Sequence, residues 1–166
     1  MESPEDSLCR QCGLCCDGSL FADVILTQEE LTPIEQIIGY EQRDDRFYLQ
    51  QPCLALECGD CQVYSNRPKG CREFECQILS ECKAGKRSTR EALATIQDLK
   101  ERIRLIRTLL NDLDQADPSL PLSYQYETAL SVAWDLSAPE EIQNKRDQLF
   151  KNVSELEAVL QDQFRS

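Results

Sequence analysis

Four cysteines lie within eight residues near the start of the chain, in the run CRQCGLCC at residues 9–16. Cys9, Cys12 and Cys15 are each separated by two residues, and the last cysteine of the run, Cys16, is adjacent to Cys15. A C-x2-C spacing lets a tight turn direct two sulfurs at one ion, as in zinc knuckles and iron–sulfur loops. The run therefore predicts a metal site built on thiolates.

A second, more widely spaced group of cysteines follows between residues 53 and 76. Its members are Cys53, Cys58, Cys61, Cys71 and Cys76. The chain contains no histidine, so ligands from these two groups can only be thiolates, or thiolates with carboxylates. Soft all-sulfur ligation selects zinc, iron–sulfur clusters or copper(I) over magnesium and calcium.

The adjacent pair Cys15 and Cys16 raises a question of geometry. Neighbouring Cβ atoms point in different directions along an extended chain. We therefore expect Cys15 and Cys16 to serve different sites, or one of them not to ligate.

Taken together, CRQCGLCC and the later segment PCLALECGDCQVYSNRPKGCREFEC resemble the CxxCxxCC cysteine-cluster family of zinc- or iron-chelating domains. The resemblance covers residues 9–76. It implies eight metal ligands: Cys9, Cys12, Cys15, Cys16, Cys53, Cys61, Cys71 and Cys76. Two cysteines, Cys58 and Cys82, lie outside the family pattern. Eight thiolates suffice for two tetrathiolate sites, or for one cluster with some cysteines not ligating.

Five further residues match motif positions of the same family: Tyr64, Arg67, Pro68, Arg72 and Phe74. A tetrathiolate centre is anionic, so we expect Arg67, Lys69 and Arg72 to offset its charge. Tyr64 and Phe74 are expected to shield it.

The resemblance also bears on the cofactor. The family includes flagellin lysine methylases, which look like iron–sulfur proteins, and this implies a [4Fe–4S]-type cluster in preference to zinc. The expected role is then redox, electron transfer or sensing. One alternative is a structural zinc module acting as an interaction adaptor, and another is an enzyme such as a protein lysine methylase. No nucleophile–base pair, phosphate-binding glycine loop or HExxH motif is recognisable, so enzymatic activity stays open.

Charge and hydropathy limit the partners and the compartment. The formal charge is −12, and residues 1–85 carry 16 acidic and 7 basic side chains. An acidic surface argues against nucleic acid as a partner. No secretory signal follows the acidic start MESPEDSL, and no apolar run approaches the length of a membrane span. We therefore expect a soluble cytoplasmic protein, in which dense cysteine indicates metal or redox chemistry rather than disulfides.

The elements that must position these thiols divide near residue 85. All ten cysteines precede that point. The predicted fold is mainly α: a small irregular cysteine-rich metal-binding module over residues 1–85, followed over residues 86–166 by a helical hairpin or three-helix bundle. In the first module, TQEE at Thr27–Glu30 is a capping box that opens a short helix containing Ile34 and Ile37. Short strands are expected around RFYLQ and DCQVY.

In the second region, STRE at Ser88–Glu91 is a capping box opening a long helix that we expect to end near Asp117-Pro118. Its apolar seam is Ala92, Ile96, Leu99, Ile103, Ile106, Leu110 and Leu113. A shorter helix is predicted over residues 123–137, with Trp134 on its apolar face. Ser137 is the expected N-cap of a last helix. The apolar seam of this last helix is Ile142, Leu149, Val153, Leu156 and Leu160, interrupted by Arg146. Such seams pack together within one chain, or they present a docking surface for a protein partner.

Overall fold

The computed structural model describes residues 4–35, 39–133 and 135–165. Two compact units divide the chain: the first comprises residues 1–75 with 119–121, and the second comprises residues 76–118 and 122–166. Each unit is described by itself below. The predicted boundary near residue 85 falls inside the second unit. The division into two domains stays a prediction.

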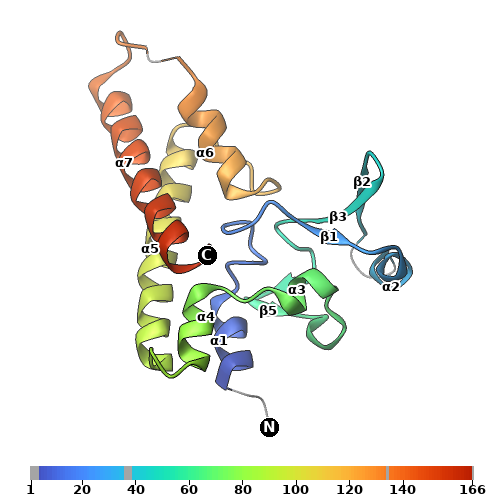
Figure 1. Cartoon of the computed structure of the whole chain (residues 1–166). Coiled ribbons are helices and arrows are strands. Elements are labelled where there is room, and N and C mark those ends of the chain that lie inside the picture. Colours follow the sequence, from blue (N-terminus) through green and yellow to red (C-terminus); the bar gives the residue numbers. More distant parts are fainter. Residues whose placement is uncertain (1–3, 36–38, 134, 166) are drawn as a thin grey trace. The chain divides into compact units, whose positions relative to one another are not determined.

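The first unit is built from short elements, in keeping with the prediction of an irregular module (Figure 1). In chain order they are α1 (Pro4–Cys12), β1 (Asp23–Leu26), the 3-10 helix η1 (Gln28–Glu30), α2 (Leu31–Glu35), β2 (Glu41–Arg43), β3 (Arg46–Gln50), β4 (Leu56–Glu57), β5 (Asp60–Cys61), the 3-10 helix η2 (Tyr64–Asn66) and α3 (Lys69–Glu73). The second unit consists of α4 (Gln77–Lys83), α5 (Thr89–Asp112), α6 (Leu122–Ser131) and α7 (Glu140–Gln163). The predicted fold class is therefore confirmed: a cysteine-rich region followed by helices.

Two small antiparallel sheets organise the first unit. One has the strand order β1-β3-β2, with Val24 opposite Leu49. The other is the β4–β5 hairpin, in which Leu56 faces Cys61. The hairpin turns through Cys58 and Gly59, both at positive φ (49° and 83°), as tight two-residue hairpin turns require. The expected strand RFYLQ is β3.

The core of the first unit is small and includes a cysteine. One cluster of buried residues consists of Leu26, Leu31, Ile34, Leu49, Cys53 and Ala55. Leu8, Leu14 and Leu20 of the same unit are also buried. The predicted capping box at Thr27 is present, since the Thr27 N–H and hydroxyl both donate to the Glu30 carboxylate, at 2.8 and 3.0 Å. It opens η1 rather than a regular helix, and α2 follows directly. Ile37 lies outside the described residues.

The second unit is a bundle in which α7 runs antiparallel to α5 (Figure 1). The capping box at Ser88 is confirmed: Glu91 N–H donates to Ser88 Oγ (3.2 Å), and Ser88 N–H donates to Glu91 Oε2 (2.9 Å). The apolar residues of both seams are buried here except Leu113 and Ile142, which are half-buried. The seams therefore pack within the chain.

Two predictions about helix ends were wrong: the end of α5 near Asp117-Pro118 and the N-cap of α7 at Ser137. The reason is local in each case. Helix α5 ends at Asp112 because Asp114 takes a left-handed conformation (φ 54°) and Gln115 N–H returns to Leu110 O at 2.8 Å. Helix α7 begins after Pro139 because the Ser137 hydroxyl and N–H instead donate to Asp135 Oδ1, at 2.6 and 2.8 Å.

Helix α6 is shorter than the predicted span of residues 123–137. It ends at Ser131, where Arg146 of α7 donates to Val132 O at 2.6 Å. The polar interruption in the second seam therefore serves the carbonyl end of α6. Trp134 lies outside the described residues.

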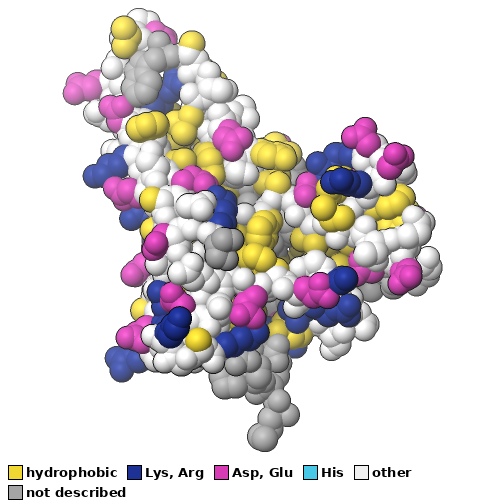
Figure 2. Space-filling model, in the orientation of Figure 1, with side chains coloured by type: hydrophobic (Ala, Val, Ile, Leu, Met, Phe, Trp, Pro, Cys, Tyr) yellow, Lys and Arg dark blue, Asp and Glu magenta, His cyan; other side chains and the backbone are white. Residues whose placement is uncertain are grey.

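On the face drawn in Figure 2, Lys and Arg side chains lie among Asp and Glu side chains. The absence of a nucleic-acid partner stays a prediction.

Candidate metal centre

The tight turn after α1 positions Cys16. Gly13 takes a left-handed conformation (φ 69°) and its N–H donates to Cys9 O at 3.1 Å, which closes the helix. Cys16 N–H then donates to Gly13 O at 2.9 Å. Cys53 N–H donates to Cys16 O at 2.8 Å, so a backbone hydrogen bond joins the first cysteine run to the second.

Cys53 and Cys61 come from the loop after β3 and from the β4–β5 hairpin. Leu56 N–H donates to Cys53 O at 3.0 Å, and Leu56 pairs with Cys61 across the hairpin. Cys53 is buried in the core, and Cys16 and Cys71 pack against that core. Three of the predicted ligands thus lie in or beside the core of the first unit.

Cys71 lies on α3, and two residues hold that helix in place. A Cβ on Gly70 would lie 2.7 Å from Val24 Cγ1, so only glycine allows α3 this close to β1. The Glu30 carboxylate accepts a hydrogen bond from Lys69 N–H at the start of α3. The pKa of Glu30 is lowered by this bond and by its bonds from Thr27, although burial alone would raise it.

The charges of other cysteines help to raise the pKa of three thiols in the first unit. Burial is the main reason why the pKa of Cys16 is raised to about 12. The charges of three other cysteines add to that rise: Cys53, Cys71 and Cys61. Burial likewise raises the pKa of Cys71 to about 11, with Cys53 and Cys61 adding and the Arg67 guanidinium opposing. We refer to Cys16, Cys53, Cys61 and Cys71 as the Cys16 group.

The pKa of Cys53 is also raised, mainly by burial. Backbone hydrogen bonds from Ala55 and Leu56 act in the opposite direction and favour its thiolate. Amides that donate to sulfur in this way are suited to a thiolate that ligates a metal.

The Cys16 group does not form a closed ligand set in this structure. Among the described residues, no three or more cysteine, aspartate or glutamate side chains are arranged to hold one ion. The four thiols are close enough to influence one another's charge, and ligation would require them to move closer together. Their donor chemistry fits zinc or an iron–sulfur cluster, since all four candidate ligands are soft sulfurs.

The other four predicted ligands lie on α1, in the turn that follows it and at the start of α4. Cys9 and Cys12 are on α1 and Cys15 is in the turn that follows, all half-buried. Cys76 is the N-cap of α4 in the second unit. Burial is the largest cause of its raised pKa, and the charge of Cys82 adds to it. Ligation by these four cysteines stays a prediction, as does the assignment of Cys15 and Cys16 to different sites.

The two cysteines outside the family pattern differ from each other. Cys58 is exposed at the tip of the β4–β5 hairpin, whereas Cys82 is half-buried on α4.

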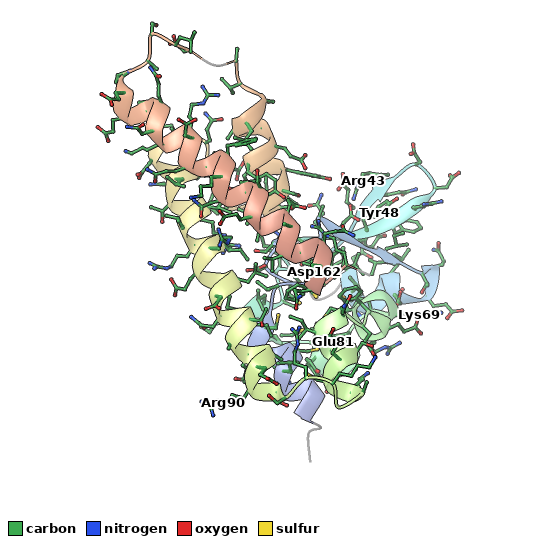
Figure 3. The ribbon with its side chains drawn as sticks, turned by 60° about the vertical axis from the view of Figure 1, so that its left-hand side comes forward. Arg43, Tyr48, Lys69, Glu81, Arg90 and Asp162 are labelled. Atoms are coloured by element: carbon green, nitrogen blue, oxygen red, sulfur yellow. The ribbon has the colours of Figure 1, made fainter. Side chains whose placement is uncertain are left out.

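The motif side chains expected around the centre have more specific contacts than the sequence suggested. The Arg67 guanidinium lies over the Tyr64 ring, 3.5 Å from its centroid. The Phe74 ring makes an edge-to-face contact with Phe21, with centroids 4.7 Å apart. Lys69 pairs with Glu73 at 3.9 Å, on the exposed side of α3 (Figure 3).

Sequence reasoning missed two contacts that position Cys71: the close approach of Gly70 to β1 and the bond from Lys69 N–H to Glu30. A glycine immediately before a predicted ligand is a usable signal of close backbone approach. The sequence predicts the bonds between Glu30 and Thr27, but it carries no signal for the contact of Glu30 with Lys69, which is distant in the sequence.

Comparison with known proteins places these observations in context. The model of a family described as "CxxCxxCC: Putative zinc- or iron-chelating domain" matches residues 8–101, which is more than half of the chain. No curated protein and no solved structure matches the chain. No helix within the described ranges is long and apolar enough to cross a membrane.

Proposed function

The chain belongs to the CxxCxxCC family of zinc- or iron-chelating domains, and from this premise we propose that it holds a metal centre through the Cys16 group. One observation carries the proposal: Cys53 lies in a buried cluster of the first unit with Cys16 and Cys71 packed against it, and the charge of Cys61 acts on all three. The charges of Cys53, Cys61 and Cys71 all act on Cys16. Mutual repulsion of buried thiolates is relieved when a cation binds among them.

The residues of the group would hold and release protons as well as metal. Because burial raises the pKa values of Cys16 and Cys71, their sulfurs keep their protons at neutral pH until a cation displaces them. Metal binding is then coupled to proton release and to folding. Arg67, whose charge favours the Cys71 thiolate, would offset part of the negative charge.

For the identity of the metal, we propose a [4Fe–4S]-type cluster in preference to zinc, with a redox, electron-transfer or sensing role in the cytoplasm. When bound, such a cluster supplies one-electron redox chemistry. The support is the all-sulfur donor set, together with the resemblance of the two cysteine motifs to a family that includes iron–sulfur enzymes. Cytoplasmic thiols stay reduced, as such a centre requires.

The test is to purify the full chain without oxygen and measure iron, zinc and acid-labile sulfide alongside the visible spectrum. We expect iron and sulfide in comparable amounts, with a broad visible absorbance that bleaches on reduction. A colourless protein containing stoichiometric zinc would overturn the cluster and keep the thiolate site. A protein containing neither metal would overturn both.

A structural zinc module that acts as an adaptor is the second candidate. It is favoured by the small size of the first unit, because a module of this size usually needs a cross-link to be stable. A protein partner would not use the seams, since Ile103 is only 2% exposed. It would use exposed side chains of the long helices, such as Phe150, which is 60% exposed. Zinc without any redox response would select this candidate.

A further inference from the structure

The Tyr64 ring lies between two guanidinium groups. Arg10 Cζ is 4.1 Å from the ring centroid and Arg67 Cζ is 3.5 Å from it. Arg67 Nε also donates to Tyr64 O at 2.9 Å, which fixes one of the two cations. Arg10 Nη1 lies 3.5 Å from Asp60 Oδ1. Arginine over an aromatic face is an attractive contact, and it is stronger when partly buried.

We call Arg10, Tyr64 and Arg67 the stack, and it joins two parts of the chain that carry cysteines. Arg10 is on α1, between Cys9 and Cys12. Tyr64 and Arg67 lie in the segment that begins at Cys61 and ends at Cys71. The stack therefore joins the helix that carries the first cysteine run to a segment with a member of the Cys16 group at each end.

We propose that Tyr64 is a positioning residue that makes the order of α1 depend on metal binding at the Cys16 group. This inference rests on the proposed function. Ligation through Cys61 and Cys71 would fix both ends of the segment between them and so reduce the conformational entropy still to be lost there. The ring would then present a fixed face to Arg10, and α1 would be held with Cys9 and Cys12 in place.

The chemistry of the stack predicts which substitutions preserve it. Phenylalanine at position 64 keeps the aromatic face, whereas leucine keeps the apolar bulk and loses the attraction for a cation. Glutamine at position 10 removes the charge. Lysine keeps that charge without the planar group that stacks, so it should rescue only in part.

A second contact of the same kind supplies a matched control. Arg43 Cζ lies 4.0 Å from the centroid of the Tyr48 ring, on the β2–β3 hairpin (Figure 3). It belongs to the same unit, and it involves no residue of α1 or of the segment from Cys61 to Cys71. Tyr48→Leu therefore removes an equivalent interaction without touching the proposed connection.

The test uses the full chain carrying Cys9→Ser and Cys12→Ser, so that zinc cannot order α1 by binding to it. Hydrogen exchange of the backbone amides of residues 8–13 is measured with and without zinc. We expect zinc to slow this exchange about two- to fivefold, the ratio that corresponds to the one cation–π contact between Arg10 and Tyr64. Adding Tyr64→Leu or Arg10→Gln should abolish the slowing, whereas Tyr64→Phe and Tyr48→Leu should retain it.

Equal slowing in the parent and in the Tyr64→Leu and Arg10→Gln variants would overturn the inference, and so would an α1 that does not respond to zinc. The proposed function is checked separately, by zinc-dependent protection of the Cys16 group against alkylation, read out by mass spectrometry on the same samples. Loss of that protection in the parent would refute the metal site itself. Protection of the group without any response of α1 would refute only the role of Tyr64. The Arg10→Gln variant keeps the test decisive if Tyr64→Leu fails to fold.

Discussion

Cys53 and Cys58 lie five positions apart in the sequence and have opposite surroundings. Cys53 is 9% exposed, belongs to the Cys16 group and sits in the core of the first unit. Cys58 is exposed at the tip of the β4–β5 hairpin. The two residues form a matched pair for testing which thiols hold metal.

We predict that Cys53→Ser lowers the metal content of the purified protein and weakens metal affinity by at least about tenfold, because a hydroxyl replaces a soft ligand. Cys58→Ser should leave both unchanged. Elemental analysis and competition with a chelator measure the two quantities. Equal loss of metal in both variants, or in neither, would contradict the assignment of the Cys16 group.

At the residue scale, the sequence alone names eight candidate thiols but does not group them. Spacing and motif resemblance predict Cys16, Cys53, Cys61 and Cys71 as ligands, yet they also predict four others with equal weight. Which sulfurs become neighbours depends on hydrogen bonds between distant segments, such as that from Cys53 N–H to Cys16 O. No pattern within either cysteine run encodes that pairing.

At the element scale, α3 packs closely on β1, because Gly70 lies directly against Val24. We predict that Gly70→Ala destabilises the first unit by about 2 kcal/mol, since an added methyl group must displace a packed side chain. It should also weaken metal binding, because α3 carries Cys71. Chemical denaturation and metal competition check the two effects.

The double variant Gly70→Ala/Val24→Ala serves as the control, because it returns the missing space between α3 and β1. It should recover much of the metal affinity. If the double variant binds metal no better than Gly70→Ala alone, close packing of α3 on β1 is not what positions Cys71.

Helix α5 depends on its capping box. Ser88→Ala should destabilise the second unit by about 1 kcal/mol, because the N–H of Glu91 loses its acceptor. Ser137→Ala should cost less, since Ser137 bonds to Asp135 and does not cap α7. Urea unfolding followed by helical circular dichroism measures both, and a larger effect at Ser137 would contradict the structure.

The same capping box predicts a pH dependence. The hydroxyl and N–H of Ser88 hold the pKa of Glu91 below its usual value. The stabilisation that the Glu91 carboxylate gives to α5 is therefore complete above the pKa that Glu91 has in the unfolded chain. It is lost as the pH falls through the lowered pKa that Glu91 has in the folded chain. The unfolding free energy of Glu91→Gln should differ from that of the parent at neutral pH and converge with it in acid.

At the element scale, the sequence predicted the long helices well and their ends less well. The seam from Ala92 to Leu110 and the cap at Ser88 follow local rules of spacing and hydrogen bonding. The end of α5 depends on the left-handed conformation of Asp114, and the start of α7 on the side chain of Asp135. The apolar periodicity does not predict either end, because one depends on a single left-handed residue and the other on the hydrogen bonds of a single side chain.

For the whole molecule, the two units differ in what stabilises them. The second buries two long apolar seams, including Leu99, Ile106 and Leu156. The first has a small core with thiols in and beside it. We expect metal removal by a chelator to unfold the first unit while the helical signal of the second persists, because structural thiolate sites contribute on the order of 10 kcal/mol to folding.

The central claim is that one metal centre is ligated by the sulfurs of the Cys16 group. X-ray absorption at the metal edge of the full chain, purified without oxygen, tests it most directly. The account predicts a first coordination shell made of sulfur, with about four sulfurs at ~2.3 Å from each metal atom, and a sulfur replaced by a lighter atom in Cys53→Ser. A first shell of oxygen or nitrogen, or a sulfur shell unchanged by Cys53→Ser, would contradict it.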